Sequence, residues 1–166
     1  MQWLIDIIME AIEAKDYTTL AEVLATVRGT RFLAYRHDST QSIPSGGYNT
    51  VELNDIIFDT KSEWWAIWHG IKVVEAGYYQ CSFSVGFRPT VGIDKKFFSV
   101  LFVNGTYQAI AMNHSSHSDY LSACGSILIH LNAGDAVRLS CSHNSGFNVN
   151  LDYSNQLTYL SIERAA

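Results

Sequence analysis

The feature that most constrains this chain is a series of short apolar runs, which starts at Arg31 and continues to the end. Gly, Asn, Asp and Ser separate the runs at intervals of about 8–12 residues, and no helical periodicity of useful length occurs among them. Such a series predicts an all-β sandwich or barrel. We expect ten strands, at residues 32–36, 50–53, 71–74, 78–85, 97–103, 106–112, 126–131, 136–142, 147–151 and 157–162.

One of these runs, residues 78–85, alternates strictly. The side chains of one face are apolar and predict contact with a core: Tyr79, Cys81, Phe83 and Val85. The opposite face holds Gln80, Ser82 and Ser84, which are small and polar rather than charged. A freely solvated strand usually carries Lys, Glu or Thr, so this face is suited to close packing against another surface.

The run at residues 97–103 is apolar on both faces. In a two-layer sandwich one face of each strand contacts the core, and the other normally contacts water. The second apolar face, formed by Phe98, Val100 and Phe102, therefore needs a cover. We expect either the N-terminal segment or a neighbouring subunit to supply it.

The first 30 residues have a different periodicity. Residues 2–15 carry an apolar stripe at helical spacing, formed by Trp3, Leu4, Ile7, Ile8 and Ile12. A shorter stripe follows the capping-box pattern of residues 19–22. Helices this short are marginal alone in water, so they must pack on their own head, on copies of themselves or on a host assembly. We expect residues 1–30 to form a short α-helical docking or oligomerisation segment and residues 31–166 to form the head.

Turns and loops are predicted between the strands. Asn104-Gly105 lies between two apolar runs, which is a strong hairpin signal, and Ala133-Gly134-Asp135 also separates two alternating runs. Residues 41–48 and 114–119 are rich in small and polar residues. We expect both stretches to be exposed loops.

Composition excludes several classes of protein. The net charge of −5 argues against a nucleic-acid-binding protein. No stretch approaches the roughly 18 apolar residues of a membrane-spanning helix. The three cysteines form no C-x-x-C pair, so no disulfide framework is indicated. We expect Cys81 and Cys141 to be buried free thiols in a protein that folds in a reducing cytoplasm.

Several short patterns together resemble the C1q/TNF-type jelly roll over residues 31–166. The stretch 31–35 is similar to the family's aromatic–apolar–Ala first strand, and residues 75–83 are similar to its Gly-x-Tyr strand. The apolar strand that ends in Asn104-Gly105 also matches, as does the run from Ser122 to Val137 with its Gly134-Asp135 turn. The last run stands where the family closes its sheet.

This resemblance implies a ten-strand jelly roll that assembles as a tight homotrimer. In the family, the outer side of the Gly-x-Tyr strand faces the trimer interface, so the positions carried over are Tyr78, Gln80, Ser82 and Ser84. We add the second apolar face of residues 97–103 to the expected interface, because it also needs a covering surface: Phe98, Val100 and Phe102.

Departures from the family's usual architecture favour a viral setting. The sequence contains no Gly-X-Y collagen repeats, no secretory leader and no transmembrane stalk, one of which an animal member normally shows. A trimeric head with a short docking segment resembles bacteriophage virion proteins, either tail-fibre or receptor-binding tips or capsid decorations. We expect a non-enzymatic virion structural protein, made in the host cytoplasm. Its expected partners are itself, other virion proteins and a host-surface glycan or protein. The alternative is a soluble TNF/C1q-type ligand or carbohydrate-recognition module of a cell.

The most unusual cluster is the tryptophan-rich stretch with Trp64, Trp65 and Trp68. One interpretation is a packed plug beneath a loop or at a subunit interface. The other is a saccharide platform, because the faces of Trp rings stack on sugars. In that case Tyr48, in the Ser- and Gly-rich loop, would lie on the same ligand surface.

Catalytic and metal-binding patterns are weak. The pair His114 and His117, with Asp119 in the same polar loop, could ligate a metal, yet no further ligand at helical or strand spacing strengthens this pattern. The chain has no Gly-x-Ser-x-Gly, P-loop or Rossmann motif and no cupin-type histidine pattern. We therefore expect no catalytic residue, no cofactor and no metal within one chain, and a metal on a trimer axis stays open.

Overall fold

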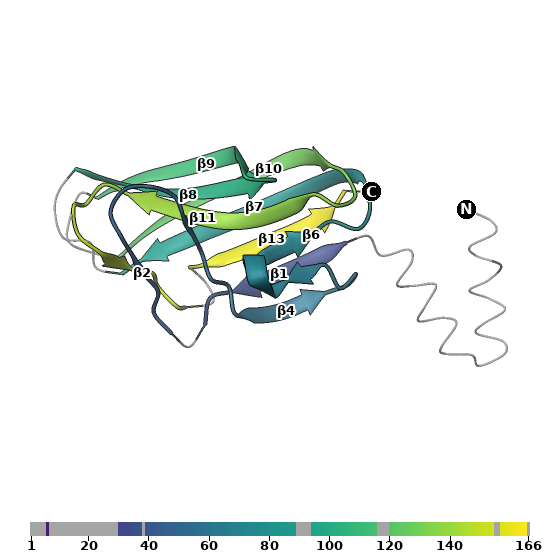
Figure 1. Ribbon diagram of the computed structural model, residues 1–166, viewed down its shortest axis with the longest axis horizontal. Helices are drawn as coiled ribbons and strands as arrows, with labels where there is room; N and C mark the ends of the chain where they lie inside the picture. The colour runs from purple at the N-terminus through teal and green to yellow at the C-terminus, as the bar shows by residue number, and fades with distance from the viewer. Residues whose placement is uncertain are drawn as a thin grey trace.

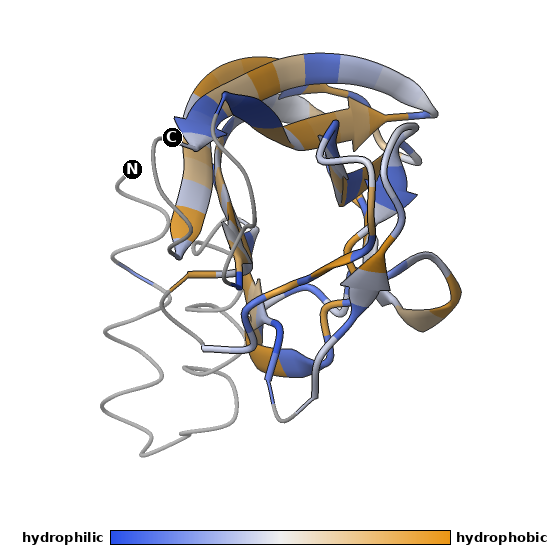
Figure 2. Cartoon of the chain, turned by 90° about the vertical axis from the view of Figure 1, so that its left-hand side faces the viewer, coloured by the Kyte–Doolittle hydropathy of each residue, from blue (hydrophilic) through white to orange (hydrophobic). Residues whose placement is uncertain are grey.

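The computed structural model describes residues 6, 30–37, 39–88, 94–115, 120–154 and 157–165. Two antiparallel sheets pack face to face around one apolar core (Figure 1). Figure 2 views the sandwich from one end and shows apolar and polar residues alternating along its strands. The predicted all-β sandwich is confirmed.

The first sheet contains five strands. Its order is β10 (Leu121–Leu131), β7 (Gly77–Phe87), β13 (Tyr159–Arg164), β1 (Arg31–Tyr35) and β4 (Asp55–Asp59). Neighbouring strands in this order are far apart in sequence, which is the pattern of a jelly roll rather than of simple hairpins.

The second sheet ends in a long hairpin, β8 (Lys95–Val103) and β9 (Thr106–Ser115), at one edge. Its order is β5 (Trp64–Trp65), β6 (Gly70–Lys72), β11 (Ala136–His143), β8 and β9. The short β3 (Asn49–Thr50) also pairs with β11, and β2 (Ser42–Ile43) pairs with β12 (Val149–Asn150). A single turn of 3-10 helix, Ala66–Trp68, connects β5 to β6.

The core confirms the alternation predicted for β7. Tyr79, Cys81, Phe83 and Val85 are all at most 1% exposed. Burying an apolar side chain of this size stabilises the fold by roughly 1.5–3 kcal/mol. Cys81 and Cys141 are buried free thiols, as predicted, whereas Cys124 is exposed.

The two predicted tight turns are confirmed and contact each other. Asn104 and Gly105 both have positive φ, 51° and 81°, as the hairpin between β8 and β9 requires. The Asn104 side chain donates to Asp135 Oδ1 at 2.8 Å and accepts from the Ala136 N–H at 2.9 Å. The turn between β10 and β11 is thereby fixed to the turn between β8 and β9.

Strand boundaries differ from prediction where the apolar signal is weak. β4 lies outside the ten predicted strands, because its apolar run, Ile56-Ile57-Phe58, is only three residues long and is flanked by Asp55 and Asp59. β10 begins five residues earlier than predicted, because the inward positions Ala123 and Gly125 carry little hydrophobic signal. β9 continues to Ser115, so His114 lies in a strand rather than in a loop.

The stretch 41–48 is exposed at most of its positions, as predicted, but it also packs on the second sheet through Ile43. Ile43 is buried, and its carbonyl lies 3.0 Å from His143 Nε2, while the Gly46 N–H donates to the His143 carbonyl at 2.8 Å. The Tyr48 ring then contacts the Phe102 ring edge to face, with 5.4 Å between centroids.

This packing corrects the expectation for the outer face of residues 97–103. Within the single chain Val100 is 0% exposed and Phe102 is 7% exposed, and Tyr48 of the same chain covers Phe102. These two side chains therefore need neither the N-terminal segment nor a neighbouring subunit as a cover.

The predicted N-terminal helices, with Trp3, Leu4, Ile7, Ile8 and Ile12, lie outside the described residues. The division of the chain at residue 30 therefore stays a prediction. Within the described part, no helix is long and apolar enough to cross a membrane.

Candidate functional site

The first candidate surface is the outer side of β7 and β10, which we name the β7/β10 face. Its side chains alternate with the core residues of the two strands: Tyr78, Gln80, Ser82, Ser84, Cys124, Ser126, Leu128 and His130. Neither strand contains Asp, Glu, Lys or Arg. Tyr78 is 60% exposed and Leu128 is 58% exposed, so an uncharged and partly apolar surface faces outward.

The same character continues across the first sheet. One row of paired residues crosses all five strands as Ser126, Ser82, Ser161, Leu33 and Phe58. Arg31 and Glu163 lie in a neighbouring row and form an ion pair at 3.0 Å, so their charges compensate each other. Low charge together with exposed Tyr and Leu is typical of the centre of a protein–protein interface.

The residues predicted for the trimer interface fall into two groups. Tyr78 and Gln80 are exposed, Ser82 is half-buried and Ser84 is already buried, and all four lie on the β7/β10 face. Their contact with another subunit stays a prediction. Phe98, Val100 and Phe102 lie on β8 in the other sheet, whose outer side points away from the β7/β10 face. Val100 and Phe102 have almost no exposed area left to bury in an interface.

The three tryptophans of the predicted cluster lie in two different environments, one against the core and the other on the outer side of the second sheet. Trp64 stacks on Phe32 of the core, with ring centroids 5.7 Å apart and planes 11° apart. Asp59 holds this segment in place, because its carboxylate accepts from the N–H of Glu63 at 2.9 Å and from that of Trp64 at 2.7 Å. Trp64 is therefore a packed plug.

Trp65 and Trp68 instead begin a stack across the outer side of the second sheet. Their rings are stacked, with centroids 5.2 Å apart. Lys72 Nζ lies 5.6 Å from the Trp65 centroid, and the Arg138 guanidinium lies 5.4 Å from the centroids of both Trp68 and Phe102. We name this arrangement the cation–aromatic stack: Lys72, Trp65, Trp68, Arg138, Phe102 and Tyr48.

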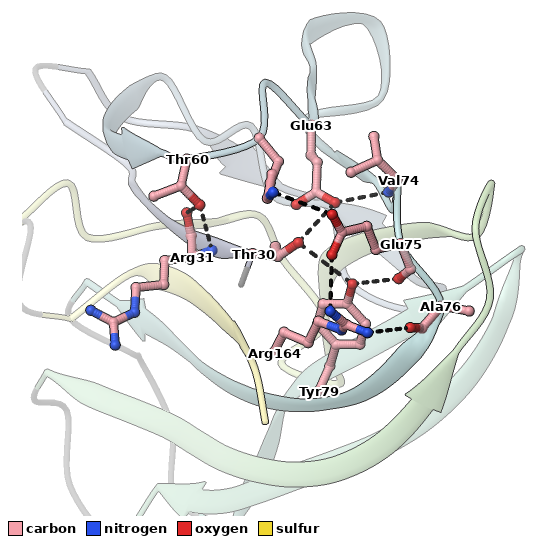
Figure 3. Close-up of polar contacts among 10 residues, drawn as sticks. Thr30, Arg31, Thr60, Glu63, Val74, Glu75, Ala76, Tyr79 and Arg164 are labelled. Atoms are coloured by element: carbon pink, nitrogen blue, oxygen red, sulfur yellow. Dashed lines mark hydrogen bonds and ion pairs between the residues drawn. The ribbon is translucent and has the colours of Figure 1, made fainter. Parts of the chain in front are cut away.

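A buried carboxyl group anchors the segment that precedes the stack (Figure 3). Glu63 is only 3% exposed, and its Oε1 accepts from Thr30 Oγ1 at 3.1 Å and from the Val74 N–H at 2.8 Å. Burial raises the pKa of Glu63 in spite of these hydrogen bonds. Nearby, Arg164 pairs with Glu75 at 2.9 Å. The cluster fastens the start of the head to β7 and β13.

The second candidate surface is an open groove of about 590 Å³ beside the stack. Residues of the segment 41–52, the turn Ile67–His69 and Arg138 line this groove. Gly70 permits this arrangement, because a Cβ atom there would lie 2.2 Å from the Val137 carbonyl oxygen. We name this space the Arg138 groove.

Sequence reasoning placed Tyr48 and Trp68 near a ligand surface but missed Arg138. The structure brings Trp68 to the groove, places Tyr48 on the adjoining Phe102, and turns Trp64 into the core. The sequence does not predict a functional role for Arg138, because a single arginine in an alternating strand normally indicates a position exposed to solvent. Only the pairing of β11 with β6 and β8 shows that it lies beneath aromatic rings.

Metal-binding chemistry is tested only in part. Within the described ranges no group of three or more His, Cys, Asp or Glu side chains could hold a metal ion. His114 lies at the end of β9, whereas His117 and Asp119 lie outside the described residues.

Comparison with known proteins identifies the fold. No family model and no curated protein matches the sequence. The crystal structure of murine APRIL at pH 5.0 matches with a TM-score of 0.65 at 15% identity, over 83% of this chain and 100% of that one. The head is a C1q/TNF-like jelly roll.

Two further structures agree with this assignment. Eiger TNF from S. frugiperda matches with a TM-score of 0.62 at 11% identity, over 84% of this chain and 94% of that one. The globular domain of zebrafish complement 1qA protein matches with a TM-score of 0.57 at 13% identity, over 84% and 98%. Identities this low show the fold alone, so the C1q/TNF-like resemblance is confirmed at that level.

Proposed function

We propose that this chain is a non-enzymatic attachment head that assembles as a homotrimer through the β7/β10 face. The observation that carries the proposal is the absence of Asp, Glu, Lys and Arg from β7 and β10. Leaving this broad surface in water would expose Tyr78 and Leu128 without compensation. A threefold assembly is also what the C1q/TNF-type resemblance implies.

In a closed ring of three subunits, each subunit uses two different surfaces. The first surface of one subunit contacts the second surface of the next. The edge strand β9 supplies the second surface in this proposal. Its outward side chains Tyr107, Ile110 and Met112 are 57%, 46% and 52% exposed. Phe98, which pairs with Met112, is the one member of the predicted β8 set that retains exposed area beside them.

In this proposal the trimer belongs to a virion. The apolar stripe of residues 2–15 docks the head on the particle, as a tail-fibre tip or a capsid decoration, and the jelly roll projects towards the host surface. The partners are then the chain itself, other virion proteins and a host-surface glycan or protein. The head acts by binding, with no catalytic residue.

A second candidate is a soluble ligand or recognition module of the TNF/C1q type. The observation that favours it is the similarity of the head to murine APRIL and to the zebrafish complement 1qA globular domain. Electron microscopy of purified particles separates the two. Trimeric density on the particle surface is expected for the virion head, and the chain's absence from particles, together with a soluble trimer, contradicts that setting.

A further inference from the structure

The charge of Arg138 has no counterpart in the structure. Among the residues described, no carboxylate forms an ion pair with its guanidinium and no group accepts a hydrogen bond from it. Its Nε is buried without a partner. The nearest acid of the groove, Glu52, instead lies 3.8 Å from Arg36. A half-buried cation without a partner is unfavourable, so an anion that enters the groove would gain this interaction.

Aromatic rings hold the guanidinium in one orientation. It lies over Trp68 and over Phe102, 5.4 Å from each centroid, and the Phe102 ring is in turn in edge-to-face contact with Tyr48. The guanidinium presents its N–H donors as a planar fork, and among the described residues no acceptor pairs with them. This fork matches the two oxygens of a carboxylate, and holding it in advance lowers the entropy lost on binding.

The other groups of the groove are mainly neutral. Ser42, Asn49 and Thr50 form a neutral, polar part of the groove wall, and Asn49 Nδ2 is a buried donor without a partner in the described structure. Hydroxyl and amide groups of this kind exchange hydrogen bonds with ligand hydroxyls. Ile67, which is 84% exposed, and the edge of Trp68 provide an apolar rim. The volume suits a small ligand rather than a folded partner.

We propose that the Arg138 groove binds a saccharide that carries a carboxylate, with Arg138 on the carboxylate and the Ser42–Thr50 wall on the sugar hydroxyls. This inference rests on the proposed function, since it names the ligand class of the attachment head. One unpaired cation selects a single negative charge, and the neutral hydrogen-bonding wall favours a polyhydroxylated ring over an acidic peptide.

The test is a titration of the full ¹⁵N-labelled chain with glucuronate and with glucose, its neutral counterpart. We expect glucuronate to shift the Arg138 Nε–H and Trp68 indole N–H resonances, and glucose to shift them far less. Arg138→Gln should weaken glucuronate binding about tenfold or more, because a charge-assisted pair is lost. Lys72→Gln is the matched control: it removes the cation at the other end of the same stack and should leave the affinity unchanged.

A further variant keeps the test decisive if Arg138→Gln does not fold. Ile67→Glu changes an exposed side chain and places a carboxylate on the rim, so it should repel glucuronate without affecting stability. Equal responses to glucose and glucuronate, equal losses in Lys72→Gln and Arg138→Gln, or tighter binding of an acidic peptide would overturn the inference. The oligomeric state of each sample is measured in parallel. An intact trimer that does not bind glucuronate would contradict only the proposed ligand of the Arg138 groove. A monomer that binds glucuronate would contradict only the proposed trimer.

Discussion

The outer faces of the two sheets differ in whether other parts of the same chain cover them. On the second sheet, Val100 and Phe102 are buried within the chain, and the segment 41–50 together with charged and aromatic side chains covers that side. On the first sheet, β7 and β10 leave Tyr78, Gln80 and Leu128 open, with no charged side chain among them. A face that carries its own cover needs no partner, whereas a bare uncharged face predicts one. The assembly should therefore depend on the β7/β10 face and on the exposed side of β9, and it should be insensitive to the covered part of the second sheet around Phe102.

The largest effect is expected from a charge placed at the centre of the β7/β10 face. Ser82→Arg should convert the trimer to monomers, because each subunit would bury an arginine against the β9 surface of its neighbour, which offers no Asp or Glu as a counter-ion. Size-exclusion chromatography with light scattering measures the change, and circular dichroism should show a folded monomer. Thr50→Arg is the control, since Thr50 is a half-buried polar residue on β3, which pairs with β11 in the covered part of the second sheet, and β8 lies between β11 and β9. Loss of the trimer in both variants would contradict the distinction between the faces.

The next effect concerns stability rather than assembly. In the monomeric Ser82→Arg background, Tyr48→Ala should lower the free energy of unfolding by about 1–2 kcal/mol, because it uncovers Phe102 and removes an aromatic pair. Tyr78→Ala removes a similarly exposed tyrosine whose ring contacts the exposed ring of His130 and covers no buried side chain, so it should leave the monomer within about 0.5 kcal/mol. Urea denaturation of the two variants provides the comparison, and equal losses would mean that the second face is no better covered than the first.

A smaller effect is expected from acid, through the histidine that holds the covering segment. His143 is buried, and burial lowers its pKa below the ordinary value of 6.5. The unfolded chain then binds a proton below about pH 6.5 that the folded chain does not bind, so stability should fall as the pH falls from that value. Urea midpoints across this range measure the slope. His143→Gln should flatten it, and an unchanged slope would assign the acid sensitivity to other groups.

The smallest effect is a difference in thiol reactivity. Cys124 is exposed on the β7/β10 face, whereas burial raises the pKa of Cys81 and of Cys141 to about 12. Cys124 should react with maleimide several-fold more slowly in the trimer than in monomeric Ser82→Arg, because the interface shields it. Mass spectrometry of the labelled protein identifies the site. Equal rates would place Cys124 outside the interface, and rapid labelling of Cys81 would contradict the core.

The sequence predicted the features that depend on local alternation and turn chemistry. The core face of β7, the turns at Asn104-Gly105 and Gly134-Asp135, and the all-β class follow from such patterns. The cover over β8 could not be predicted, because it depends on a contact between Tyr48 and Phe102 that no local pattern encodes. Arg138 was missed for a related reason: its environment arises from β6, β8 and the Trp68 turn together.

The most direct test of the central distinction is native mass spectrometry of the unmodified full chain at micromolar concentration. A bare and uncharged β7/β10 face predicts a mass of three chains, maintained on dilution through this range. A single-chain mass under the same conditions would show that the face is stable in water on its own, and the proposed assembly would be wrong.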